Sequence, residues 1–494
     1  MSKATTHPLH NRRRAGILLH PTSLPGPAPQ GLIGHDAYRF VDFLQQSGFS
    51  LWQMLPLGPT HSDGSPYQSL SAHAADTNLI SLDWLKDRGL LDAVQAQYDF
   101  DYHDECLLKA HECFLQDTSS TLFKDYQDFI TQQADWLDDY ALFMALREAH
   151  ANQPWTRWDT PLRKRHKAAI SKAQKEYAEQ IAYHQFCQFV FFQQWCELRN
   201  YANKRDILIF GDLPIYVSLD SADVWANPKL FCLDKECQPK FVAGVPPDYF
   251  SETGQRWGNP QYNWPALEKE DFAWWQARFK TQLALFDLLR IDHFRGFQAY
   301  WEIKAEEETA MNGRWVEAPG EALLKKLNTV FRNLPLVAED LGIITAEVDA
   351  LRQKFKLPGM KVLQFAFDFN PHNPYLPHNH EHNAVAYTGT HDNDTTLSWY
   401  QQLSQHNQHY VYNYLNAPAS DAMPWPLIRS ALSSVCCLAV LPMQDILNLG
   451  QGHRMNTPGT TENNWQWRYD WTQLHDNLAT DLNLLLRLYD RCSE

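Results

Sequence analysis

Residues Leu288–Phe297 read Leu-Leu-Arg-Ile-Asp-His-Phe-Arg-Gly-Phe. A short apolar run that ends at a turn residue is typical of a buried strand. Asp292 stands at the end of this run, where a carboxylate is costly unless another group pairs with it or uses it. Arg290 lies two residues earlier, so its side chain should point to the same side of the strand. The stretch therefore predicts a strand whose polar end carries chemistry.

Seven further apolar runs resemble this one, and nearly all of them end in Gly, Pro, Asp, Glu or His. They are Ala15–Leu19, Leu51–Leu57, Ile207–Phe210, Leu334–Ala338, Met360–Phe365, Ala384–Tyr387 and Leu438–Leu441. Most are apolar on both sides, as buried parallel strands are. Segments with helical spacing lie between them, for example from Ala37 to Leu44, before Gly48. Eight strands that alternate with helices predict an α/β fold, a single (β/α)8 TIM barrel over residues 1–494, with its catalytic groups at the C-terminal strand ends.

Two of the gaps between predicted strands are long. Residues 80–205, after the second strand, have a mainly helical pattern, and residues 217–270, after the third, are rich in Trp, Pro, Gly and Asn. Insertions after barrel strands fall on the active face. We therefore expect a helical insertion subdomain from the first gap and a loop-rich lid over the site from the second.

The net charge of −15 argues against nucleic acid or an anionic membrane surface as a partner. The one basic run, Arg163–Lys167, fits a solvated helix face better than a binding patch. The nine cysteines are scattered and form no C-x-x-C motif, which favours the reducing cytoplasm. No apolar stretch is long enough for a signal peptide core or a membrane span.

Aromatic residues are abundant, with 18 Trp, 21 Tyr and 26 Phe. Many of them neighbour Asn, Asp, Gln or Gly, as in Trp257-Gly258-Asn259. Flat aromatic faces beside hydrogen-bonding groups suit an amphipathic ligand such as a sugar ring. An aromatic-rich core is the alternative, and composition leaves both open.

Three acidic residues stand at predicted strand ends: Asp292, Glu339 and Asp392, after the fourth, fifth and seventh strands. In a barrel these carboxylates would face one central pocket. Cleavage of a glycosidic bond needs two carboxyl groups with separated pKa values, one to attack or stabilise the anomeric carbon and one to move a proton. Arg290 would keep Asp292 ionised. Helix caps or ion pairs are the alternative roles, but three acids at strand ends favour catalysis.

Histidines flank two of these acids, and His293 and His391 are candidates for hydrogen bonds to sugar hydroxyls. A separate His-rich loop contains several Pro and Asn residues, so a solvated loop is favoured over a metal site there. Its histidines are His372, His378, His380 and His382. We expect no metal and no cofactor.

Several motifs closely resemble those of family 77 glycoside hydrolases, the 4-α-glucanotransferases, which belong to the wider α-amylase clan. The resemblance covers essentially the whole chain. The motifs are His20–Gly26, Trp52–Thr60, Ser65–Ser69, Gly211–Val217, Val245–Ser251, Gly254–Pro260, Arg290–Phe297, Ala338–Gly342, Thr390–Asp394 and Arg454–Gly459. Cys436, Cys437, His453 and Ala346 depart from the usual family pattern without touching a catalytic position.

The resemblance implies that Asp292 is the nucleophile, Glu339 the general acid and base, and Asp392 a stabiliser of the transition state. It implies that the segment Pro246–Trp257 is a mobile loop over the glucan, and that Asn464, Trp465 and Trp467 have a supporting role at the rim. The substrate-binding residues that it implies are Ser65, Tyr67, Asp212, Asp248, Trp257, Asn259, Arg290, His293 and His391.

The implied activity moves an α-1,4-glucan segment to the 4-hydroxyl of glucose or of another α-1,4-glucan such as a maltooligosaccharide. Retention of configuration predicts that the carboxyl groups of Asp292 and Glu339 lie about 5–5.5 Å apart. One alternative is an α-amylase-like hydrolase that gives the intermediate to water. Another is a non-catalytic glucan-binding barrel, but that predicts a lost acid, and all three acids are present.

Overall fold

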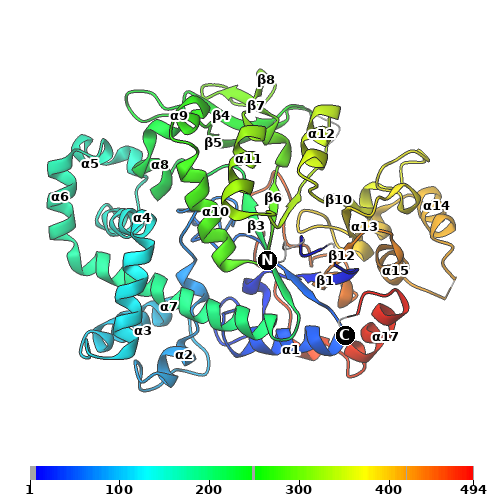
Figure 1. Ribbon diagram of the computed structural model, residues 1–494. Coiled ribbons are helices and arrows are strands. Elements are labelled where there is room, and N and C mark those ends of the chain that lie inside the picture. Colours follow the sequence, from blue (N-terminus) through cyan, green and yellow to red (C-terminus); the bar gives the residue numbers. More distant parts are fainter. Residues whose placement is uncertain (1–6, 10, 248–250, 419, 493–494) are drawn as a thin grey trace, which may run out of the picture.

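The computed structural model describes residues 7–9, 11–247, 251–418 and 420–492. Its central sheet has eight parallel strands, in the order β10-β11-β12-β1-β2-β3-β6-β9 (Figure 1). These strands are β1 (Arg14–Leu18), β2 (Leu51–Gln53), β3 (Leu208–Pro214), β6 (Leu288–Asp292), β9 (Leu336–Ala338), β10 (Gly359–Val362), β11 (Ala384–Tyr387) and β12 (Leu438–Pro442). Each overlaps one of the eight predicted runs, and the predicted (β/α)8 barrel is confirmed.

The sheet closes on itself between its two end strands, β9 and β10. The Ala338 N–H donates to the Pro358 carbonyl at 2.8 Å, and the Met360 N–H donates to Asp340 Oδ1 at 2.6 Å. These contacts join the end of β9 to the start of β10, so the eight strands form a nearly closed ring.

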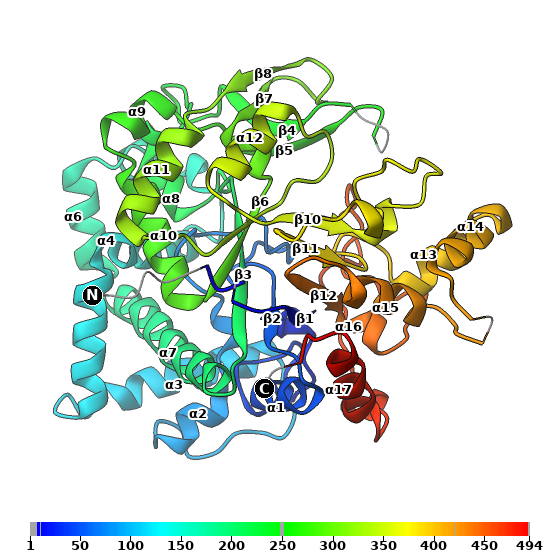
Figure 2. The ribbon, with the colours of Figure 1, turned by 45° about the vertical axis from the view of Figure 1, so that its right-hand side comes forward.

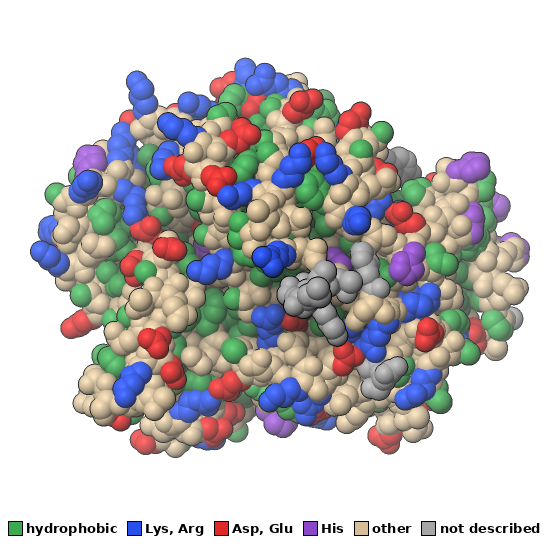
Figure 3. Space-filling model, in the orientation of Figure 1, with side chains coloured by type: hydrophobic (Ala, Val, Ile, Leu, Met, Phe, Trp, Pro, Cys, Tyr) green, Lys and Arg blue, Asp and Glu red, His purple; other side chains and the backbone are tan. Residues whose placement is uncertain are grey.

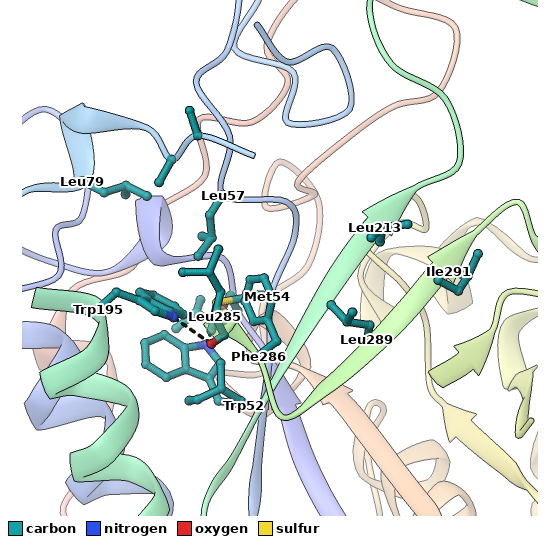
Figure 4. Close-up of a cluster of buried hydrophobic side chains, with 14 of the residues drawn as sticks. Trp52, Met54, Leu57, Leu79, Trp195, Leu213, Leu285, Phe286, Leu289 and Ile291 are labelled. Carbon is teal, nitrogen blue, oxygen red and sulfur yellow. Dashed lines mark hydrogen bonds between the residues drawn. The ribbon is translucent and has the colours of Figure 1, made fainter. Parts of the chain in front are cut away.

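Side chains of the barrel strands alternate between two apolar clusters. On β6, Leu289 and Ile291 belong to the outer cluster, together with Trp52 and Phe286 (Figure 4). Leu288 faces the other way and packs inside the barrel with Phe210 and Val337. Because side chains alternate along a strand, Arg290 and Asp292 lie on the same inner side of the barrel as Leu288.

The helices that cover the ring include α1 (His35–Ser47), which ends at Gly48 with φ 80°, as its apolar spacing predicts. The others around the barrel are α8 (Ala222–Ala226), α9 (Trp264–Lys269), α10 (Ala273–Leu285), α11 (Gly320–Phe331), α12 (Ala346–Lys354), α13 (Thr396–Gln402), α14 (Gln405–Leu415), α15 (Trp425–Ser433), α16 (Met443–Ile446) and α17 (Leu478–Leu488). Helix α17 packs against α1, so the last helix of the chain lies beside the first one (Figure 2).

Between β2 and β3 the chain forms a helical region on the left of Figure 1. Its last helix, α7, is fixed to the barrel by the Trp195 indole N–H, which donates to the Leu285 carbonyl at 2.8 Å (Figure 4). The helices are α2 (Leu82–Asp87), α3 (Phe100–Phe114), α4 (Thr121–Ala149), α5 (Thr160–Arg163), α6 (Lys167–Glu176) and α7 (Ala178–Asn203).

A second, four-stranded antiparallel sheet lies above β3 and β6 in both ribbon views, in the order β5-β4-β7-β8 (Figures 1 and 2). Two of its strands follow β3 and two follow β6. Their short, mixed sequences are not among the eight apolar runs, so this sheet was not predicted. They are β4 (Phe241–Val245), β5 (Gln255–Pro260), β7 (Ala299–Lys304) and β8 (Gly313–Glu317).

Acidic and basic side chains are interspersed over the face shown in Figure 3. The basic run is engaged with acids of the same chain, since Arg163 and Lys164 both pair with Glu236, at 2.8 Å and 3.2 Å. Within the described ranges, no helix has the length and apolar character needed to cross a membrane.

Candidate active site

The polar ends of β3, β6 and β9 lie next to one another. In the register of the ring, Asp212 pairs with Arg290, and Ile291 pairs with Ala338. Asp292 directly follows Ile291, and Glu339 directly follows Ala338, so the two acids have neighbouring backbone positions. Adjacent strands thus bring the first two of the three predicted catalytic acids to one end of the barrel.

Arg290 joins two carboxylates. Its Nη1 lies 2.6 Å from Asp212 Oδ2, and its Nη2 lies 3.0 Å from Asp292 Oδ1. Burial alone would lower the pKa of Arg290, but Asp212 and Asp292 outweigh it and raise this pKa well above its ordinary value. The side chain of Asp292 is 29% exposed, against 6% for Arg290. A fixed positive charge therefore supports a carboxylate that a ligand can still reach.

Asp212 is the buried partner in this arrangement. Its Oδ2 also accepts a hydrogen bond of 2.8 Å from the Tyr67 hydroxyl. Burial raises the pKa of Asp212, although Arg290 works in the opposite direction. Among the described residues, its Oδ1 has no hydrogen-bond partner, and neither does the buried Nε2 of His293. A buried polar atom without a partner is costly, so hydroxyl groups of a ligand would satisfy both atoms.

Glu339 is held by backbone N–H groups. His293 N donates to Oε2 at 2.7 Å, and Leu341 N donates to Oε1 at 2.9 Å. His293 has a left-handed backbone, with φ 53°, at the turn after β6. Burial raises the pKa of Glu339 to about 7, with Arg290 lowering it and Asp292 raising it. At neutral pH this carboxyl group can therefore both give and take a proton.

Asp392 lies in the loop after β11 and is bound from the far end of the chain. The Asn456 amide donates to Asp392 Oδ1 at 2.6 Å, and Arg454 Nη2 donates to the Asp392 carbonyl at 2.6 Å. Arg454 Nε also donates to the Asn456 carbonyl at 2.6 Å, which ties the two segments together. The side chain of Asp392 remains 45% exposed.

An aromatic wall connects Asp392 to the Arg290 network. The Tyr67 ring stacks on His391 with centroids 5.2 Å apart, and the Tyr67 hydroxyl lies 2.9 Å from His391 Nε2. Trp465 packs beside both rings, 5.9 Å from Tyr67 and 6.1 Å from His391. Burial raises the pKa of Tyr67 well above its ordinary value, so the hydroxyl stays protonated.

The remaining predicted binding residues lie in the loop after β2 and in the insertion after β3. Trp257, on β5, makes a T-shaped contact with the His293 ring, with centroids 4.9 Å apart. Asn259 is buried, and its amide donates to the Val217 carbonyl at 2.9 Å, so it fixes the loop after β3. Ser65 lies in the turn before Tyr67, where its N–H donates to Asp63 Oδ1 at 3.1 Å. Asp248 lies outside the described residues.

Three residues near the site were not singled out from the sequence. Arg454 and Asn456 stand in a motif that was quoted without a role, because only the folded chain brings them to Asp392. His20 follows β1 and lines the same end of the barrel as His391. Burial, and then His391, lower the pKa of His20 to about 3. A histidine directly after a predicted barrel strand is the signal that could have identified it.

Among the described residues, no group of three or more His, Cys, Asp or Glu side chains is placed to hold a metal ion. In the His-rich loop, His378 Nδ1 lies 2.8 Å from the Tyr414 hydroxyl, and His380 Nδ1 lies 2.7 Å from Ser434 Oγ. These histidines contact neighbouring side chains of the fold.

Comparison with known proteins supplies the family context. The family model described as 4-alpha-glucanotransferase, glycoside hydrolase family 77, matches residues 19–473. The 4-alpha-glucanotransferase of Synechocystis sp. is 49% identical over 97% of this chain and 98% of the relative. That of Thermus thermophilus is 50% identical over 92% and 94%. The amylomaltase from Streptococcus agalactiae, solved in complex with acarbose, superposes with a TM-score of 0.94 at 38% identity, over 98% of this chain and all of the other.

Proposed function

This chain belongs to glycoside hydrolase family 77, the 4-alpha-glucanotransferases, and acts on α-1,4-glucans, and we propose that it does so by a retaining double displacement on Asp292 and Glu339. One observation carries the proposal. A partly exposed carboxylate, Asp292, paired with Arg290, lies on the strand next to a buried carboxyl group, Glu339, whose pKa is raised to about 7. Two carboxyl groups in such different environments suit a nucleophile and a proton donor.

In the first step, an Asp292 oxygen attacks C1 of the glucosyl unit at the bond to be cleaved. The C1–O4 bond breaks, and Glu339 gives its proton to the departing O4 of the shortened glucan. The products of this step are a glucosyl ester on Asp292 and an ionised Glu339. Arg290 supports Asp292 before attack and also binds Asp212, so it stays in place as the charge of Asp292 changes.

In the second step, Glu339 accepts the proton of an acceptor 4-hydroxyl. The acceptor O4 attacks C1, the ester bond to Asp292 breaks, and both carboxyl groups return to their starting states. Two inversions at C1 give net retention, for which the carboxyl groups of Asp292 and Glu339 should lie about 5–5.5 Å apart. Asp392 stays unbonded and holds sugar hydroxyls in the orientation that Asn456 gives it.

The donors and acceptors in this proposal are maltooligosaccharides and longer α-1,4-glucans, with glucose as the shortest acceptor. Residues 217–270 would act as the lid and residues 80–205 as a helical insertion subdomain. Trp257 would stack on the bound glucan beside His293, where it would keep water from the glucosyl ester. The Streptococcus agalactiae relative was solved in complex with acarbose, which supports a glucan-like ligand for this chain. We place the enzyme in the cytoplasm, which suits its nine free cysteines.

Incubation with maltotriose alone tests the activity. Transfer produces glucose together with maltodextrins longer than maltotriose. An α-amylase-like hydrolase would produce only glucose and maltose, and a non-catalytic barrel would leave maltotriose intact. Full activity of Asp292→Asn would contradict the mechanism.

A further inference from the structure

A groove of about 450 Å³ lies beside Trp257. Its other wall comes from the helical region between β2 and β3. We propose that this groove binds the sugar units of long acceptors beyond the one that reacts, with Arg157 as a residue that determines acceptor length. The inference rests on the proposed function. The residues that line the groove include Gln68, Thr156, Arg157, Ser218, Gln238 and Trp257.

The position of Trp257 places this groove on the side where the leaving chain departs and the acceptor enters. The Trp257 ring packs against His293, and the His293 N–H holds the Glu339 carboxyl group. Glu339 exchanges its proton with O4 of the leaving or incoming chain. The aromatic wall of Tyr67 and His391 instead packs around Asp212 and Asp392. An acceptor whose O4 meets Glu339 would therefore extend past Trp257.

The far wall of this groove is fixed to the barrel. The Trp155 indole N–H donates to the Leu219 carbonyl at 2.6 Å, and the Trp155 backbone N–H donates to Asp220 Oδ1 at 3.1 Å. Arg147 forms an ion pair with the other oxygen of Asp220. The 3-10 helix Trp155–Arg157 is thus held at a set distance from the loop after β3. A fixed wall costs little ordering free energy when a ligand binds.

The chemistry of the lining suits a glucan. One aromatic side chain stands at the catalytic end, and amide, hydroxyl and guanidinium groups follow along the groove. Arg157 and Gln238 are exposed and reach the groove from opposite insertions. The carboxylate of Asp220 is already engaged by Trp155 and Arg147, so among the described residues the free charge on this wall is the Arg157 guanidinium, which can only donate. Sugar hydroxyl and ring oxygens are its natural partners.

A competition between two acceptors isolates this groove. With α-maltosyl fluoride as donor, the leaving group is fluoride, so no glucan occupies the groove before the acceptor arrives. Labelled glucose and labelled maltopentaose then compete for the same maltosyl enzyme, and the product ratio reports only the acceptor step. Arg157→Ala should reduce the preference for maltopentaose about tenfold, because a hydrogen bond from a charged group typically contributes that much. Thr156→Trp, which fills the groove, should reduce it at least as far.

Transfer to glucose should stay at the wild-type rate in both variants. Lys172→Ala, which removes an exposed cation from α6, is the matched control and should leave the ratio unchanged. A wild-type ratio in both groove variants, or an equal loss with both acceptors, would overturn the inference. A wild-type enzyme that transferred to neither acceptor would count against the proposed function. Calorimetry would still decide the inference, since Arg157→Ala should weaken maltoheptaose binding and spare maltose binding.

Discussion

Arg290 Nη2 lies 3.0 Å from Asp292 Oδ1, and the two residues stand two positions apart on the same strand. The second guanidinium nitrogen holds Asp212 at 2.6 Å, so the arginine cannot swing away from Asp292, the proposed nucleophile. This geometry needs a planar side chain with two donors at a fixed spacing.

Arg290→Lys should lower kcat roughly ten- to hundredfold, because one ammonium cannot hold both carboxylates and a lost charge-assisted hydrogen bond is worth about 1.5–3 kcal/mol. The initial rate of maltotriose disproportionation measures this effect. Arg199→Lys is the matched control, since Arg199 pairs with Asp287 away from the site. Equal rates for Arg290→Lys and the wild type would contradict the role given to Arg290.

The proton on Glu339 should determine the alkaline limb of the pH–activity profile. Its pKa of about 7 means that the proton needed for the first step is lost as the pH rises through that value. We expect kcat/KM for maltotriose to fall tenfold per pH unit above this point. The profile from pH 5 to pH 9 measures it, and a flat profile up to pH 9 would show that Glu339 is not the acid.

The raised pKa of Glu339 also affects the stability of the fold. A carboxyl group whose pKa is raised on folding stabilises the fold below its ordinary pKa of 4.5, and that contribution is lost as the pH rises through about 7. Glu339→Gln has no such proton to lose. The Tm of Glu339→Gln relative to wild type should therefore increase between pH 5 and pH 8. A Tm difference independent of pH would argue against a buried ionised Glu339.

Asn456 should hold the Asp392 carboxylate in its working orientation. Asn456→Asp would place a second carboxylate where the amide now donates to Asp392 Oδ1 at 2.6 Å. We expect kcat to fall roughly tenfold or more, since like charges at this distance repel and Asp392 would turn away from the sugar. Glu462→Gln, at an exposed position of the same C-terminal segment, is the control. Unchanged kinetics of Asn456→Asp would rule out this positioning role.

Trp257 should influence how much of the glucosyl enzyme reacts with an acceptor sugar and how much reacts with water. Trp257→Ala removes the aromatic face beside His293, so acceptor affinity should fall roughly three- to tenfold and more of the glucosyl enzyme should react with water. Reducing ends released from maltotriose, compared with longer maltodextrins formed, measure this partition. Trp84→Ala on α2 controls for the loss of a tryptophan. An unchanged ratio of transfer to hydrolysis would contradict this role of Trp257.

The barrel was predictable from the sequence because its strands are buried on both faces. Continuous apolar runs such as Leu438–Leu441 then identify them directly. The sheet formed by β4, β5, β7 and β8 was not predictable in this way. Its edge strand β5 reads Gln-Arg-Trp-Gly-Asn-Pro and pairs with β4, which in turn pairs with β7 from the segment after β6.

The residues of the candidate site likewise differ in how far the sequence alone predicts their positions. Asp292 and Glu339 could be located because each directly follows a predicted strand. The hydrogen bond from Asn456 to Asp392 joins residues 64 positions apart through two loops, and no local pattern encodes that pairing. The amide of Asn259 also shows this limit, since only the fold reveals that the Val217 carbonyl accepts from it.

The central claim is that Asp292 carries the glucosyl group between donor and acceptor. Glu339→Gln, incubated with α-maltosyl fluoride, should accumulate the ester because the fluoride leaves without a proton and no base activates the acceptor. Peptide mass spectrometry should then find one maltosyl unit on the peptide that contains Asp292. Absence of any adduct, or an adduct on Asp392, would contradict the account.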